Sequence, residues 1–257
     1  MNMSEIIRAA YGEKPADVLL TNGQMINVLT GEIEQRAIAV SKGIIIGFGQ
    51  YKAEKILDLN KRFVAPGFID SHVHIESAMT CISEFVRAVA VHGTTTVAAD
   101  PHEIANVLGA EGIAYMMQSA EEQPINIYFT LPSCVPATDM ETAGARLSAE
   151  DLAPFLNHEK IVALAEMMNY PGVVGGDPSC LQKIAMTGDR AIDGHAPGLL
   201  VCAPPLGRID PRHRRRHVRA VRRDDTDGVD VGAGQERGRI GVMIAAQLLG
   251  HRHGVPG

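Results

Sequence analysis

The chain has 257 residues, of which 46% are hydrophobic and 21% charged, and a formal net charge of -6. Its length fits one barrel-sized α/β domain or part of a barrel with a small second domain. The composition excludes a fibrous or disordered chain, no apolar run reaches the roughly 18 residues of a membrane-spanning helix, and the N-terminal residues do not match a secretory signal. The cysteines are widely spaced without a Cys-x-x-Cys pair, which favours free thiols in a cytoplasmic protein: Cys81, Cys134, Cys180 and Cys202.

Residues 1–62 are expected to form a small β-sandwich-like domain. Short apolar runs alternate there with turn signals at Asn22-Gly23, Thr30-Gly31 and Lys42-Gly43, the spacing typical of β-hairpins. The charged residues of this segment are those expected in turns and at strand ends, so we expect no catalytic site in it.

From residue 63 the pattern changes to strands that alternate with helical segments, which predicts βα units around a parallel sheet. Ser148 is expected to cap a short helix, with Asp151 in the capping-box position. We predict five strands, within residues 63–74, 94–103, 125–138, 161–172 and 191–198, and helices within 82–93, 104–122 with a break near 109–112, 148–156 and 181–190.

Each of the five predicted strands ends in polar side chains. In parallel α/β barrels the loops at the carboxyl ends of the strands meet over one mouth, where the chemistry takes place. We therefore expect these side chains to share one site in residues 63–200: His72 and His74, Asp100 and His102, Ser133, Glu166, and His195.

The pattern His72-x-His74 predicts a metal site. Successive side chains of a strand point to opposite faces, so these two imidazoles project to the same side. With Glu166 and His195 they would supply three nitrogens and a carboxylate that could bridge two divalent ions, among which the residue types do not choose. Such a site brings the pKa of bound water from about 15.7 to near 7, which favours hydrolysis.

Each of these residues also has an alternative explanation. A His-x-His pair occurs on exposed strand faces, and His195 could lie in a turn. Glu166 stands in an apolar strand, where a buried carboxylate needs a partner, and we favour a metal over a salt bridge. His102 and Glu103 could act on the substrate or in proton transfer, although Glu103 could equally begin the next helix.

Several segments resemble the bacterial adenine deaminases of the amidohydrolase superfamily. They are GFIDSHVHIESAM, HGTTTVAADPHEIANVLG, LPSCVPAT, AEMMNYPGV and DGHAPGL, and the resemblance covers roughly residues 15–200. It implies a TIM-like (β/α) barrel of the amidohydrolase type and a small β-domain built from both chain ends. It also implies hydrolysis of adenine to hypoxanthine and ammonia, by attack of metal-activated hydroxide at C6.

The resemblance implies roles for individual residues. His72 and His74 would bind one metal, Glu166 would bridge to a second, and His195 would bind that second ion. Manganese or iron are the usual metals of this binuclear centre, and zinc is an alternative. Around the pocket it places Glu166, Asp100, His102 and Glu103 as catalytic residues and Ser133 as a substrate-binding residue. The partner is then a small molecule, adenine, with no membrane; a homo-oligomer is an open alternative.

The resemblance stops after Gly198. Residues 201–257 have eleven arginines and no lysine, whereas the residues before them have six arginines and seven lysines. We expect a poorly ordered tail from a frameshift or truncation, which leaves an incomplete barrel of about five strands out of eight. The rival explanation, a basic arm at 212–223 that neutralises phosphates, lacks interleaved aromatic residues, so we do not expect nucleic-acid binding.

Other functions stay open at this stage. Another amidohydrolase, acting on a cyclic amide or another purine, would keep the site and change the pocket, whereas a truncated remnant would be inactive. The cytidine-type zinc deaminases combine H-x-E with P-C-x-x-C. His74-Ile75-Glu76 matches the first half of that motif, but no Cys-x-x-Cys follows, so we attribute the match to chance.

Overall fold

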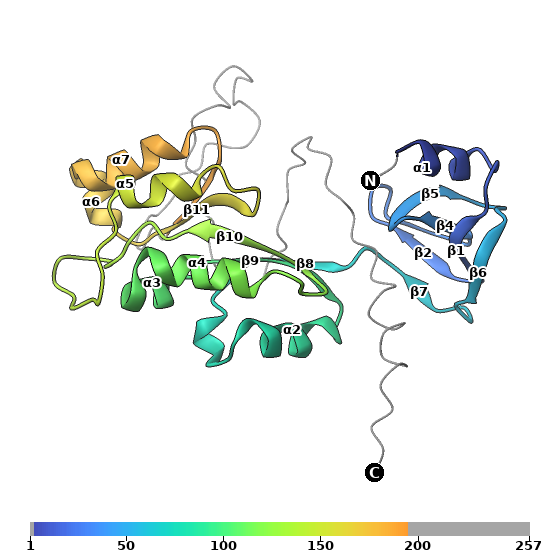
Figure 1. Cartoon of the computed structure of the whole chain (residues 1–257), viewed down its shortest axis with the longest axis horizontal. Helices are drawn as coiled ribbons and strands as arrows, with labels where there is room; N and C mark the ends of the chain where they lie inside the picture. Colours follow the sequence, from blue (N-terminus) through green and yellow to red (C-terminus); the bar gives the residue numbers. More distant parts are fainter. Residues whose placement is uncertain (1–2, 195–257) are drawn as a thin grey trace, which may run out of the picture. The chain divides into compact units, whose positions relative to one another are not determined.

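The computed structural model describes residues 3–194 of the chain, coloured along the sequence in Figure 1. Two compact units divide these residues, one comprising 3–69 and 90–95 and the other 70–89 and 96–194. His195 and the predicted tail at 201–257 lie outside the described residues. No helix in the range 3–194 is long and apolar enough to cross a membrane.

The first unit consists of one helix and two small sheets. The four-stranded sheet has the order β5-β4-β1-β6, and the three-stranded sheet the order β3-β2-β7. On β1 and β4 of the larger sheet, Ala16, Leu19 and Ala39 form one buried cluster, and Leu20 and Ile38 belong to another. The elements are α1 (Met3–Ala10), β1 (Ala16–Thr21), β2 (Gln24–Asn27), β3 (Glu32–Glu34), β4 (Ile38–Ser41), β5 (Ile44–Phe48), β6 (Ala53–Asp58) and β7 (Phe63–Val64).

Two of the three predicted hairpins are present. Lys42 and Gly43, with φ of 51° and 75°, connect the antiparallel pair β4 and β5, and Gly31, with φ of 75°, lies between β2 and β3. The hairpin predicted at Asn22-Gly23 is wrong, because β1 and β2 belong to different sheets. Asn22 adopts φ of 53° and its Nδ2 donates to Asp58 Oδ1 at 2.9 Å, so this turn carries the chain from one sheet to the other.

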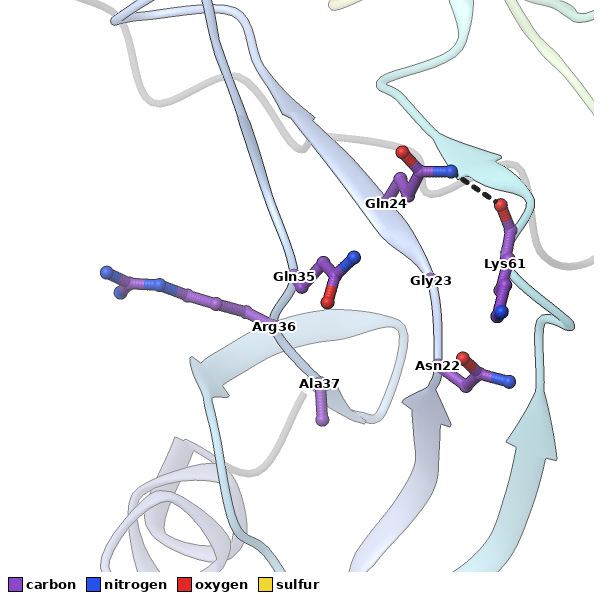
Figure 2. Close-up of a pocket in the computed structure, with 7 residues that line it drawn as sticks. All are labelled: Asn22, Gly23, Gln24, Gln35, Arg36, Ala37 and Lys61. Atoms are coloured by element: carbon purple, nitrogen blue, oxygen red, sulfur yellow. Dashed lines mark hydrogen bonds between the residues drawn. The ribbon is translucent and has the colours of Figure 1, made fainter.

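A polar hollow of about 230 Å³ opens in the first unit (Figure 2). Gln24 Nε2 donates to the carbonyl oxygen of Lys61 at its rim, at 2.8 Å. None of the lining residues is a histidine, cysteine or carboxylate, so this hollow offers no metal site: Asn22, Gly23, Gln24, Gln35, Arg36, Ala37 and Lys61.

A five-stranded sheet in the order β12-β11-β10-β9-β8 is the framework of the rest of the described chain (Figure 1). The registers of β9, β10, β11 and β12 are parallel. β8 also runs parallel to β9, since Phe68 N bonds to Gly93 O and Asp100 N to Val73 O. The prediction of five consecutive strands of an incomplete (β/α) barrel is confirmed: β8 (Phe68–Val73), β9 (Thr94–Ala99), β10 (Asn126–Leu131), β11 (Ile161–Met167) and β12 (Ala191–Gly194).

The helices follow the predicted order with local differences. Gly109, with φ of 63°, separates α3 from α4, and Ser148 and Asp151 form the predicted capping box. The prediction that the fourth strand runs to 172 is wrong, because Asn169 caps a short helix whose first turn contains Pro171. The helical elements are η1 (Glu76–Ala78), α2 (Ile82–Ala90), α3 (His102–Leu108), α4 (Ala110–Ser119), α5 (Ala149–Leu152), η2 (Ala153–Phe155), α6 (Tyr170–Gly175) and α7 (Pro178–Thr187).

The strands of this sheet bury one continuous core. Ile127, Phe129 and Leu131 of β10 are at most 1% exposed, while the residues between them are partly exposed, which is the alternation expected of a strand. β11 is buried at almost every position, including Glu166. The carboxyl end of this sheet therefore carries two buried carboxylates, Glu166 and Asp100.

Candidate metal centre

Two imidazoles meet at the end of β8, as the spacing predicts. His72 lies on β8, and His74 is the first residue after this strand. The Nε2 atoms of the two rings are 3.0 Å apart. The ring centroids are 4.8 Å apart and the planes are nearly perpendicular. Two nitrogens that bind the same ion, each at about 2.1 Å, lie roughly 3.0 to 3.4 Å from each other. The separation of this pair therefore suits a shared ion.

Glu166 of β11 faces both imidazoles. Its Oε1 lies 3.4 Å from His74 Nε2 and its Oε2 lies 3.7 Å from His72 Nε2. The residue is only 6% exposed, and an ionised carboxylate at such a site needs cationic or metal partners. The predicted grouping of His72, His74 and Glu166 is present, while the fourth predicted ligand, His195, lies outside the described residues.

Asp100, which follows β9, and His102, the first residue of α3, join the same group. His102 Nδ1 and Asp100 Oδ2 are 2.9 Å apart, and His102 Nδ1 lies 3.9 Å from Glu166 Oε1. Burial opposes protonation of His102, but the hydrogen bond to Asp100 and the nearby carboxylate charges outweigh it and raise the pKa of the imidazole to about 8. Burial also raises the pKa of Asp100, against the effect of His102. Asp100 and His102 therefore form a proton-holding pair beside Glu166.

The donor set suits a divalent metal. One ligand atom from each of His74, Asp100, His102 and Glu166 lies within 4.8 Å of all the others. Asp100 Oδ1 is buried without a hydrogen-bond partner, which leaves a carboxylate oxygen available. Imidazole nitrogens with carboxylate oxygens are ligands for zinc, iron and manganese. The residues present thus fit a divalent ion, and Asp100 and His102, predicted as catalytic residues, belong to the same group of possible ligand atoms.

The orientation of His74 is set by the backbone of β9. Its Nδ1 lies 3.2 Å from the carbonyl oxygen of Asp100, which can only accept a hydrogen bond. Nδ1 therefore carries the proton in the neutral ring, and Nε2, the nitrogen that faces His72 and Glu166, keeps its lone pair.

Asp193 of β12 is a site residue that the sequence analysis missed. Its Oδ2 lies 2.6 Å from His72 Nδ1, and this hydrogen bond is the main cause of a raised pKa of His72. The sequence contains a signal for it: Asp193 stands two residues before His195, the same spacing as in His72-x-His74. Strand alternation would have marked Asp193 as a residue on the face of that predicted ligand.

A second hydrogen-bonded group ties η1 to α3 beside the imidazoles. Glu76 Oε1 accepts from the backbone N–H of Ile104 at 3.3 Å, and the Ser77 hydroxyl donates to Glu103. Glu103 Oε2 lies 3.7 Å from His74 Nδ1, and burial raises the pKa of Glu76. Glu103 therefore lies in the first turn of α3 and also close to the site. Both predictions for it, a residue at the start of a helix and a residue of the site, agree with this position.

Ser133 lies in the loop after β10 and is 2% exposed. Its hydroxyl donates to the carbonyl oxygen of Glu166 at 2.6 Å, and its own carbonyl oxygen accepts from Lys183 Nζ at 2.8 Å. These contacts fix the backbone that carries Glu166. A direct contact of Ser133 with substrate stays a prediction.

The comparison with known proteins identifies the family. The model of the amidohydrolase family matches residues 63–200, which include every described residue of this centre. The chain belongs to the amidohydrolase family. Its candidate metal site lies at the carboxyl ends of parallel strands, where the chemistry of α/β barrels takes place.

Curated relatives of this amidohydrolase carry a more specific name. The adenine deaminase of Desulfatibacillum aliphaticivorans is 51% identical over 197 residues, which are 76% of this chain and 35% of that protein. The adenine deaminase of Methanothrix thermoacetophila is 42% identical over 246 residues, 95% of this chain and 42% of that protein, so this alignment extends into residues after 198. The chain thus spans between about a third and two fifths of the length of these curated relatives.

Solved structures are more distant in sequence. The atrazine chlorohydrolase of Arthrobacter aurescens, solved with zinc, is 14% identical and has a TM-score of 0.49, covering 69% of this chain and 52% of that one. A D-hydantoinase is 20% identical with a TM-score of 0.47 and covers 69% of this chain and 39% of that one.

Proposed function

We propose that this amidohydrolase hydrolyses adenine to hypoxanthine and ammonia at the group of imidazoles and carboxylates beside the carboxyl ends of β8, β9 and β11. The observation that carries the proposal is the convergence of His72, His74 and His102 on the buried carboxylate of Glu166. The adenine deaminase names of relatives at 42 to 51% identity support the choice of substrate.

The described residues that would hold the metal lie on or directly after two strands, β8 and β11. His72 and His74 would bind one divalent ion and Glu166 would bridge to a second, for which His195 is the predicted ligand. Manganese or iron is our proposal for the ion, with zinc as the alternative. When bound, such an ion makes hydroxide available at neutral pH by lowering the pKa of water to near 7.

The chain's own residues would move the protons of the reaction. Water adds to C6 of adenine and the C6–N bond breaks, so one proton must reach the departing amino group for ammonia to leave. His102 Nδ1 lies 2.9 Å from Asp100 Oδ2 and 3.9 Å from Glu166 Oε1, so this pair can hold and release a proton at the edge of the site. We assign this transfer to His102 with Asp100, and assign to Glu103, 3.7 Å from His74, a supporting charge at the same edge of the site.

The remaining parts of the proposal concern substrate contacts and location. Ser133, fixed against the Glu166 backbone, borders the same end of β10 and is our candidate for contact with the purine. Cys81, Cys134 and Cys180 are free thiols, which is consistent with the reducing cytoplasm that we propose as its compartment. Assembly into a homo-oligomer stays a prediction.

The test is turnover by the full chain. The purified protein, loaded with manganese, is given adenine, and ammonia and hypoxanthine are measured together; guanine and a cyclic amide are the parallel substrates. Release of equal amounts of hypoxanthine and ammonia from adenine, lost in the His102→Ala variant, supports the proposal. Turnover of the cyclic amide or guanine with none of adenine would assign a different amidohydrolase reaction, and metal binding without any turnover would identify an inactive chain.

A further inference from the structure

His72 differs from its neighbour His74 in the group that holds its Nδ1. For His74 that group is a backbone carbonyl at 3.2 Å, and for His72 it is the carboxylate of Asp193 at 2.6 Å. Both rings turn their Nε2 atoms toward the same space, where Glu166 lies. The contact with Asp193 joins β8 to β12, the outer strands of the described sheet. His72 and Asp193 are 121 residues apart in the sequence.

We propose that Asp193 is a positioning residue that fixes the tautomer and orientation of His72, so that Nε2 is the metal-binding nitrogen. This inference rests on the proposed metal centre. A carboxylate accepts hydrogen bonds and does not donate when ionised, so a distance of 2.6 Å to Nδ1 requires the proton on Nδ1. In the neutral ring Nε2 then carries the lone pair, 3.0 Å from His74 Nε2.

The opposite tautomer would be unfavourable at the Nδ1 end of the ring and would block an ion at the Nε2 end. Its Nδ1 lone pair would face the Asp193 carboxylate, and two acceptors 2.6 Å apart repel each other. Its Nε2–H would occupy the space between the two imidazoles and Glu166. Charge-assisted hydrogen bonds of this kind are shorter and roughly twice as strong as neutral ones, so Asp193 holds His72 more firmly than the carbonyl oxygen of Asp100 holds His74.

A carboxylate in this position also makes the metal-binding nitrogen more basic. Partners of this kind contribute roughly 10- to 100-fold to metal affinity. Asp193 is partly exposed and comes from the last described strand, so its removal leaves no cavity in the buried core. Its effect is therefore expected on ion binding and on the ring of His72 rather than on the packing of the sheet.

The experiment compares the full chain with Asp193→Ala, Asp193→Asn and the control Asp189→Ala. Asp189 is an exposed carboxylate just before β12, so its loss changes the charge equally. In metal-free protein, at a pH where the ring is neutral, long-range ¹H–¹⁵N spectra report which nitrogen of His72 is protonated; the His72→Gln variant assigns the signal. Zinc affinity is measured by competition with a chromogenic chelator.

We expect an Nδ1–H ring in the full chain, a mixture of tautomers in Asp193→Ala with zinc affinity lowered 10- to 100-fold, and no change in Asp189→Ala. Asp193→Asn keeps an acceptor oxygen, so it should retain part of the Nδ1–H tautomer and part of the zinc affinity. If the alanine variant does not fold, this variant is compared with the full chain in its place. An Nε2–H ring in the full chain, or an alanine variant with unchanged tautomer and zinc affinity, overturns the proposal. If the full chain binds no zinc, the metal centre fails, while the spectra still decide the role of Asp193.

Discussion

Replacing Glu166 by glutamine should weaken binding of a divalent ion far more than it disturbs the fold. Glutamine has nearly the same shape as glutamate, so the buried site on β11 keeps its packing. The change removes a unit of negative charge from a position within 3.4 Å of His74 Nε2 and 3.7 Å of His72 Nε2. Any ion held by these nitrogens is therefore a near neighbour of the lost charge.

The size of the effect follows from the distances. Two unit charges about 4 Å apart interact with roughly 4 kcal/mol at an effective dielectric constant of 20. Each 1.4 kcal/mol is a factor of about ten in the dissociation constant. Since the ion carries two charges, we expect the Glu166→Gln variant to bind it at least about a thousandfold more weakly.

The assay is competition between the protein and a chromogenic chelator for manganese and for zinc, at fixed ionic strength. Glu159→Gln is the control, because Glu159 is an exposed carboxylate before the same strand. A circular dichroism spectrum establishes that each variant is folded. If Glu166→Gln binds either ion within tenfold of the unchanged chain, Glu166 is not a ligand and the proposed centre is wrong.

Three further predictions concern stability, measured by urea unfolding. Phe129 is 0% exposed in the core of the five-stranded sheet, so Phe129→Ala should cost about 3 to 5 kcal/mol, and a loss below about 1 kcal/mol would contradict this packing. Ser148→Ala removes the hydroxyl that accepts from Asp151 N at 3.2 Å and should cost about 1 kcal/mol, while Ser148→Thr should keep most of the cap. Burial lowers the pKa of Lys183, although Cys134, Cys180, Asp177 and Asp151 act in the opposite direction, so the folded chain binds this proton less well than the unfolded chain. The free energy of unfolding of the unchanged chain should therefore rise, relative to that of Lys183→Met, as the pH rises from the pKa of Lys183 in the folded chain toward its ordinary value of 10.5. A difference between the two chains that does not depend on pH would refute the lowered pKa of Lys183.

The elements of the five-stranded sheet could be predicted because their signals are local. Runs such as Ile127 to Leu131 combine β-branched and aromatic residues with alternation, and Ser148 with Asp151 forms a cap within four consecutive residues. α6 was missed because its start depends on the Asn169 side chain, which competes with continuation of β11. Residues 3–10 were assigned to a β-domain, yet form a helix that buries Ile6 and Ala9.

The site could be predicted in part for the same reason. His72 and His74 share a face through strand periodicity, and the parallel order of strands brings Glu166 to the same end of the sheet. The pairing of His72 with Asp193 depends on how strongly the sheet curls, which the spacing of residues along the chain does not determine. The same holds for Lys183, whose reach to the Ser133 carbonyl depends on the packing of α7.

The contact between β8 and β12 also bears on how this barrel segment folds. The proposed ligands come from the first and later strands of the segment, and a cation bound by them would connect these strands across the sheet. Ion loading and assembly of the strands would then be one linked equilibrium. A chelator should consequently lower the melting temperature of the five-stranded segment while leaving the small β-domain of β1 to β7 unaffected.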